Sequence, residues 1–342
     1  MPEITLTGAN AMTFPNMATW GWEIAVYLFL GGLVAGLMIF GGALNLVAAQ
    51  KFQRALLISN LTALPILGIG MLFLLFDLSN KINVWRFYTT FQLTSPMSWG
   101  AWILLFAMIV LALKFVSVIP APRATTILGA KLFQPIPTDV EEAKEAIIKK
   151  PSALVRLLEW KWNALYALAQ FAHKHDTTIS LASILLGIGV GFYTGILLSS
   201  IPSRPLWNSS VIAPLFLISG LASGGAFLCL FIPHDEHELL VPFSVLTCGV
   251  ELIFLLAYAI NMIYGAQGDQ RAGGVLFNGI FAALFWGVVV LLGLIVPATI
   301  ESFDALKRPL AFVPARVPPL LKLTGGVALR FVIVYAGLLS FL

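Results

Sequence analysis

Eight long apolar segments divide the sequence, and each is about as long as a helix that crosses a lipid bilayer. They cover residues 24–50, 55–76, 96–119, 177–201, 208–232, 239–266, 273–300 and 323–342. A spanning helix needs roughly 20 mostly apolar residues. Open sheets cannot span lipid, because their edge groups would have no hydrogen-bond partner. The pattern therefore predicts an all-α, polytopic membrane protein with eight transmembrane helices.

The overall composition excludes other classes of protein. Hydrophobic residues make up 59% of the chain and charged residues only 11%, whereas an ordinary soluble domain carries about 25% charged residues. Disorder is excluded too, because disordered chains combine low hydrophobicity with high charge. We expect residues 1–342 to form a single integral membrane domain.

The basic residues are unevenly distributed, and this predicts the orientation of the chain. Most of the 20 Lys and Arg residues fall in the connections after the first, third, fifth and seventh segments. The positive-inside rule then places both termini outside the cytoplasm, in a multi-pass protein of the cytoplasmic membrane. The net charge of +4 is thus explained by membrane orientation, and we expect no nucleic-acid partner.

The third connection, residues 120–176, is the only long polar region. Five leucines recur there at helical spacing among charged residues and tryptophans: Leu154, Leu157, Leu158, Leu165 and Leu168. This pattern is typical of an amphipathic helix that lies against lipid at the membrane surface, here on the cytoplasmic side. Docking of a partner protein is the alternative.

Polar side chains gather near the outer ends of several segments. Glu23 begins the first segment, and Tyr27 follows one helical turn deeper. Asp77 ends the second segment, and the predicted topology puts Tyr193 in the outer half of the fourth. An aromatic belt with interfacial carboxylates is one interpretation. The other is a pocket for an amphipathic ring such as a quinone, which needs hydrogen-bond donors, a proton-exchanging carboxylate and apolar walls.

Two further charges lie deeper in the predicted membrane. Glu251 is roughly 18 Å, and Arg330 roughly 10 Å, from the cytoplasmic end of its segment at 1.5 Å per residue. An unpaired charge at such depth is costly. The two residues are therefore predicted either to form a buried pair that locks two helices or to relay protons.

The sequence offers few ligands for a redox centre. An iron–sulfur cluster needs about four thiolates, and the chain has only Cys229 and Cys248. We expect no haem, because the histidines lie outside the apolar segments, and no metal site. Residues 234–238, His-Asp-Glu-His-Glu, are interpreted as a solvated loop, with metal binding as the alternative. The histidines are His173, His175, His234 and His237.

Several motifs, in order, resemble one known family. They are WGWEIAVYLFLGGLVAG at residues 20–36, Asp77-Leu78, SPMSWGAW at 95–102, YTGILL at 193–198, and LTGGVALRFVIVYAG at 323–337. Together they resemble the NrfD/PsrC family, the membrane subunits of polysulfide-reductase-like complexes. The similarity is good over the first five segments and the eighth.

The resemblance implies a fold and a set of partners. It implies eight helices in two four-helix bundles without haem, and a site for menaquinone or ubiquinone near the outer face. It further implies a ferredoxin-like iron–sulfur subunit and, beyond it, a catalytic subunit that is usually a molybdopterin enzyme. Tyr193 falls where the family places a quinone-contacting tyrosine, Glu23 and Tyr27 fall on the segment that lines the pocket, and Asp77 matches an acidic residue that ends the second helix.

We therefore expect a membrane anchor subunit of a multisubunit respiratory oxidoreductase. It would exchange electrons and protons between quinone and the iron–sulfur partner, with no catalytic residue of its own. Protons could come from outside, or Glu251 and Arg330 could relay them from the cytoplasm. A secondary transporter or channel is the alternative, although it predicts broken helices and repeated halves. The terminal substrate stays open.

Overall fold

A computed structural model describes residues 20–78, 81–92, 95–118, 153–201, 203–306 and 313–340. Eight of its helices are long and apolar enough to cross a membrane. They are α1 (Trp22–Ala48), α2 (Gln53–Asp77), α4 (Pro96–Ser117), α7 (Asp176–Ser199), α8 (Ile212–Phe231), α9 (His234–Tyr264), the π-helix η2 (Leu284–Ile295) continued by α11 (Val296–Ala305), and α12 (Val317–Leu339). The predicted all-α membrane protein with eight spans is confirmed.

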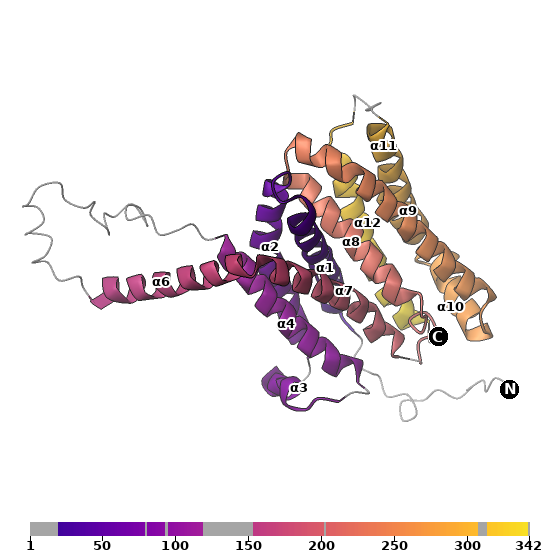
Figure 1. Cartoon of the computed structure of the whole chain (residues 1–342). Coiled ribbons are helices and arrows are strands. Elements are labelled where there is room, and N and C mark those ends of the chain that lie inside the picture. The colour runs from indigo at the N-terminus through magenta and orange to yellow at the C-terminus, as the bar shows by residue number, and fades with distance from the viewer. Residues whose placement is uncertain are drawn as a thin grey trace, which may run out of the picture.

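The spans alternate in direction and so define two faces (Figure 1). We call the end where α1 begins and α12 ends the terminal face, and the other end the opposite face. The terminal face also carries the short helices η1 (Lys81–Trp85), α3 (Arg86–Thr89) and α10 (Gln267–Phe277). Which face meets the cytoplasm stays a prediction.

Helix α1 lies at the centre of the spans and packs against α2, α7, α8 and α12. Its contact with α8 brings the two backbones together at glycines. A Cβ atom on Gly36 would lie 2.3 Å from the Gly220 carbonyl oxygen, and one on Gly224 would lie 2.6 Å from the Gly36 carbonyl carbon. Small residues at a crossing allow this close approach. Because α1 packs into both halves of the chain, the division into two four-helix bundles stays a prediction.

The sixth and seventh spans begin at different residues from those predicted. The apolar run at 273–300 joins two elements, because the last residues of α10 are apolar and pack inward. Ala272, Gly273 and Leu276 are buried there. Helix α10 ends when the Asn278 N–H bonds to the Gly274 carbonyl oxygen at 3.1 Å, and the seventh span begins only at Leu284.

At the opposite face, the acidic stretch at 234–238 is the first turn of α9 and not the solvated loop that was expected. The Glu236 carboxylate accepts hydrogen bonds from the backbone N–H groups of Arg54 at 3.0 Å and Ala55 at 2.9 Å. Glu236 is buried. The carboxylate thus satisfies two free N–H groups in the first turn of α2, where the helix dipole also favours an anion.

The third connection contains the predicted helix. Helix α6 (Ala153–Lys174) extends away from the side of the spans and contacts α4 (Figure 1). Leu165, Leu168 and Phe171 are exposed on it, as expected for an apolar face that meets lipid. Its placement on a membrane surface stays a prediction, and residues 119–152 lie outside the described part of the chain.

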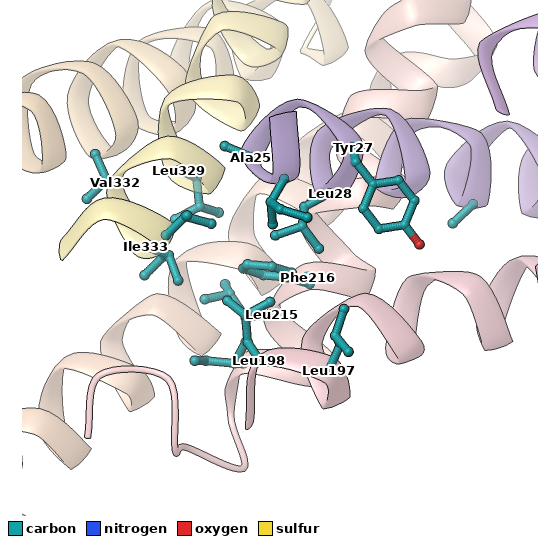
Figure 2. Close-up of a cluster of buried hydrophobic side chains, with 14 of the residues drawn as sticks. Ala25, Tyr27, Leu28, Leu197, Leu198, Leu215, Phe216, Leu329, Val332 and Ile333 are labelled. Carbon is teal, nitrogen blue, oxygen red and sulfur yellow. The ribbon is translucent and has the colours of Figure 1, made fainter. Parts of the chain in front are cut away.

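The core beneath the terminal face joins both halves of the chain (Figure 2). Leu28 of α1 packs there with Leu198 of α7, Phe216 of α8 and Ile333 of α12. Tyr27 lies at the edge of this cluster, and its hydroxyl group points away from the aliphatic side chains.

Candidate functional site

Two buried phenols, Tyr27 of α1 and Tyr193 of α7, lie close together near the terminal face. Tyr27 is fully buried and Tyr193 is 4% exposed. They are near enough to interact electrostatically, but the Tyr27 hydroxyl has no well-directed hydrogen bond to any described residue. A buried donor without a partner carries a desolvation penalty of about 1–3 kcal/mol. This hydroxyl is therefore available to a bound molecule.

The Tyr193 ring packs directly against the backbone of α4 at Gly100, where a larger residue would overlap it. A Cβ atom on Gly100 would lie 1.9 Å from both Cε2 and Cζ of the Tyr193 ring. Gly100 belongs to the motif at 95–102, but its role was not predicted, since nothing in the sequence shows which ring faces it.

Tyr88 of α3 and Trp102 of α4 extend the cluster, and sequence reasoning missed both. Their rings meet edge to face, with centroids 6.3 Å apart. The Trp102 Nε1 atom is buried and has no hydrogen-bond partner among the described residues. Tyr88 interacts electrostatically with both buried phenols. Burial raises the pKa of Tyr88 above its ordinary value, so its hydroxyl keeps its proton and stays a donor.

The two predicted carboxylates, Glu23 and Asp77, lie together above the phenols. Asp77 ends α2, interacts with the Glu23 charge and accepts a hydrogen bond from the Gly21 backbone N–H. Glu23 is in the first turn of α1, one turn from Tyr27. The structure thus brings Glu23 near Asp77 and Tyr27 near Tyr193, and all four lie towards the terminal face. Their role in binding a quinone stays a prediction. Both carboxylates are partly exposed, at the rim of the cluster.

The connection between α7 and α8 closes the terminal face beside the phenols. Trp207 is 2% exposed, stacks on Trp20 with ring centroids 4.9 Å apart, and donates through Nε1 to the Ile333 carbonyl oxygen at 2.8 Å. The Tyr258 hydroxyl donates to the Leu206 carbonyl oxygen at 2.6 Å. Trp207 therefore packs inside the protein and does not face lipid.

Glu251 and Arg330 are connected through a serine. Arg330 is 1% exposed, donates to the Ser219 hydroxyl at 2.5 Å and the Phe216 carbonyl oxygen at 3.0 Å, and lies over the Phe216 ring. Glu251 is 4% exposed and also hydrogen-bonds with Ser219. Within the described ranges the two charges form no direct ion pair. The Ser219 hydroxyl, which can both accept and donate, bridges them.

The cluster combines phenol and indole donors, apolar surroundings and rim carboxylates at one end of eight spans. Such a set can hold a flat amphipathic ring that carries hydrogen-bond acceptors. Among the described residues, no group of three or more His, Cys, Asp or Glu side chains is placed to hold a metal ion. The fold and this cluster define the class: a multi-pass membrane protein with a buried polar site near one face.

Comparison with known proteins identifies the family. The family model described as "Polysulphide reductase, NrfD" matches residues 11–341. The chain therefore belongs to the NrfD polysulphide reductase family, as its motifs indicated.

Three relatives illustrate the range of this similarity. The protein is 30% identical to a polysulfide reductase chain from Wolinella succinogenes, over 94% of its own length and 95% of the relative. It is 28% identical to protein NrfD of Escherichia coli, over 98% and 99% respectively. It is also 24% identical to a selenate reductase subunit from Mesobacillus selenatarsenatis, over 83% and 68%.

Proposed function

We propose that this protein is the membrane anchor subunit of a multisubunit respiratory oxidoreductase and exchanges electrons and protons with a membrane quinone. The observation that carries the proposal is the Tyr27 hydroxyl, which is buried beside Tyr193 without a well-directed hydrogen bond to any described residue. Tyr88, which interacts with Tyr27, also packs against the Trp102 indole, whose Nε1 has no partner among the described residues. The polysulfide and selenate reductase subunits among the relatives support the membership of a reductase complex.

The residues present fit a quinone. Its ring carries two carbonyl acceptors and an apolar tail, and Tyr27, Tyr193 and Trp102 offer donors within an apolar helix interface. When bound, a menaquinone or ubiquinone supplies a carrier of two electrons and two protons. The phenols would orient the carbonyl groups, and the helix packing around them would exclude water. Glu23 and Asp77, at the rim, would hold protons between this cluster and the aqueous side.

Electron transfer requires a partner protein. The sequence has two cysteines, fewer than the four thiolates that an iron–sulfur cluster needs. We expect a ferredoxin-like iron–sulfur subunit against the terminal face, where the cluster lies, and a molybdopterin or other catalytic subunit beyond it. Membrane lipid surrounds the spans.

Protons could reach the site by either of two routes. The rim carboxylates offer a short route from the terminal face. The Glu251–Ser219–Arg330 connection offers a second route through the later spans, and its use would make turnover electrogenic. Substitution Glu251→Gln tests the second route, since the amide cannot carry the proton.

A direct binding measurement tests the quinone site. The quinol analogue 2-heptyl-4-hydroxyquinoline N-oxide loses fluorescence on binding to quinol sites, so its Kd can be measured on the purified native complex. Tyr27→Phe and Tyr193→Phe should each raise Kd about 2- to 13-fold, the equivalent of one net hydrogen bond of about 0.5–1.5 kcal/mol. Tyr27→Phe should keep or raise the thermal stability of the quinone-free protein, because it removes a buried hydroxyl that has no well-directed hydrogen bond.

Tyr258→Phe is the matched control. It removes a buried phenol that already donates to the Leu206 carbonyl oxygen, so it should lower thermal stability and leave the Kd of the analogue unchanged. Equal Kd values for wild type and both tyrosine variants, or no binding by the wild-type complex, would contradict the proposal.

A further inference from the structure

A buried ion pair that sequence reasoning missed lies near the opposite face. The Lys322 ammonium of α12 donates to the Glu301 carboxylate of α11 and to the Ser244 hydroxyl of α9. The Ser244 hydroxyl also donates to the second Glu301 oxygen at 3.2 Å. Lys322 is 4% and Glu301 2% exposed. The sequence had placed Lys322 in a connection between spans, yet it is held inside by three helices.

A small enclosed cavity connects this ion pair to the charges deeper in the spans. Lys322, Glu251, Ser219 and Ser223 line it together with neighbouring glycines and apolar side chains. Its volume is about 10 Å³, which is at the lower limit for holding one water. Several polar groups face the space, as a bound water requires. Lys322 and Glu251 thus border the same small cavity, and one water bound there would connect them.

The packing of η2 against α12 shapes this cavity. A Cβ atom on Gly293 would lie 2.6 Å from the Gly325 Cα atom, so the two backbones touch beside the cavity. Gly293 belongs to the π-helical stretch, and such stretches frequently occur at functional sites. The same π-helix continues into α11, which carries Glu301.

The polar groups continue from the cavity towards the phenol cluster. Arg330 lies eight residues beyond Lys322 on α12, or roughly 12 Å along the helix axis. A Cβ atom on Gly32 of α1 would lie 3.0 Å from an Arg330 guanidinium nitrogen, and Tyr27 is five residues away on the same helix. The Arg330 Nε atom is buried without a partner among the described residues. A further donor is thus available beside α1.

We infer that Lys322, Glu301 and Ser244 form the proton intake site of a path from the opposite face. The path runs from the Glu301–Lys322 pair through the water-sized cavity to Glu251, Ser219 and Arg330, and ends beside α1. This inference rests on the proposed function, since it supplies protons to the quinone site. It adds three residues, on three helices, to the proposed relay.

The transfers from the intake site to Glu251 can be written as balanced proton movements, and Arg330, which keeps its proton, acts beyond Glu251 only as a hydrogen-bond donor. A proton leaves Lys322 Nζ, so that one N–H bond breaks, and an O–H bond forms on a Glu251 carboxylate oxygen after exchange through water. Lys322 regains its proton from Glu301, which takes it from the opposite face. No electrons move in these steps. For proton release at the opposite face the same steps run in reverse.

A purely structural ion pair is the competing explanation, and it predicts a different behaviour. Replacing a buried ion pair by neutral groups is often neutral or stabilising, whereas removing one partner leaves a costly buried charge. If the pair is only structural, the neutral double variant Lys322→Met with Glu301→Gln should fold and work normally. If the pair carries protons, the double variant should fold and still block the path.

The experiment uses the native complex in proteoliposomes of known orientation, with pyranine inside or outside to follow pH at each face. Turnover is started with two compounds. One is 2,3-dimethyl-1,4-naphthoquinol or its quinone, and the other is the substrate of the co-purified catalytic subunit. That substrate is found by screening sulfur compounds, oxyanions, formate and hydrogen, beginning with polysulfide and selenate. We expect the double variant to lower the rate of proton exchange at the opposite face during turnover about tenfold or more, since a positioned proton carrier contributes about 10²–10⁴-fold in rate.

Two controls give the outcomes their meaning. Lys114→Met removes another buried ammonium near the opposite face, one that donates to the Ser180 hydroxyl at 3.3 Å. This variant should leave proton exchange at the opposite face unchanged. Glu251→Gln should reduce proton exchange as the double variant does. Normal exchange in a folded double variant while Glu251→Gln reduces it would overturn the intake site alone. No effect of Glu251→Gln would overturn the whole relay, and no quinone-linked turnover at all would overturn the proposed function as well.

Discussion

At the residue scale, Tyr27 is hard to explain by packing alone. Leu28 beside it is fully buried in the aliphatic core, as expected of an apolar side chain on the central helix. A phenylalanine at position 27 would fill the same space without burying an unpartnered hydroxyl. Burial of a hydroxyl without a partner is unfavourable, so under the proposed function we expect the bound quinone to complete the hydrogen bond.

Gly100→Ala gives a prediction for the second phenol. The new methyl group would overlap the Tyr193 ring, so the phenol must move, and we expect the Kd of the quinol analogue to rise about tenfold. Overpacking should also lower the free energy of unfolding by about 1–3 kcal/mol. Gly68→Ala is the matched control on α2, because no atom lies within 4 Å of its Cβ position. An unchanged Kd for Gly100→Ala would show that Tyr193 does not contact the ligand.

The site residues that the sequence predicted can be placed by their position along a span, whereas most of those it missed depend on how a helix is rotated. Glu23, Tyr27, Asp77 and Tyr193 stand near the same ends of predicted spans, so topology alone brings them to one face. Trp102 and Lys322 depend on the rotation of their helices, which the segment pattern does not give. Glu301 was missed because it follows the last predicted apolar residue and resembles the start of a connection.

At the element scale, the start of α2 depends on a carboxylate from α9. Glu236→Gln removes the charge that accepts from the Arg54 and Ala55 N–H groups. Hydrogen bonds to charged groups contribute about 1.5–3 kcal/mol each, so we expect a lower midpoint of thermal unfolding in detergent. Asp235→Asn, an exposed change in the same helical turn, should have little effect. Equal midpoints for the two variants would contradict the capping role.

The elements themselves were largely predictable. Eight apolar runs gave eight spans, because only a helix satisfies its own backbone groups in lipid. The predicted start of the seventh span was wrong because α10 ends in apolar residues, which look like the beginning of a span. A single Asn278 beside them only weakly indicates that a helix ends there. The prediction of a solvated loop at 234–238 was wrong because the partner of Glu236, the start of α2, is about 180 residues away in the sequence.

At the scale of the whole molecule, the orientation of the chain in the membrane is a prediction that can be tested directly. The basic residues predict that both termini lie outside the cytoplasm. A C-terminal alkaline phosphatase fusion, active only after export, should be active, and a C-terminal green fluorescent protein fusion should be dark. A bright fluorescent fusion would reverse the orientation, and with it the side on which the iron–sulfur partner is expected.

The central claim is that this protein binds quinone as part of a reductase complex. The most direct measurement is gentle affinity purification from native membranes, followed by mass spectrometry of the co-purifying proteins and of the extracted lipids. The account predicts an iron–sulfur subunit, a catalytic subunit and a stoichiometric quinone, with less quinone in the Tyr27→Phe variant. Recovery of the protein alone, without quinone and without a redox partner, would contradict it.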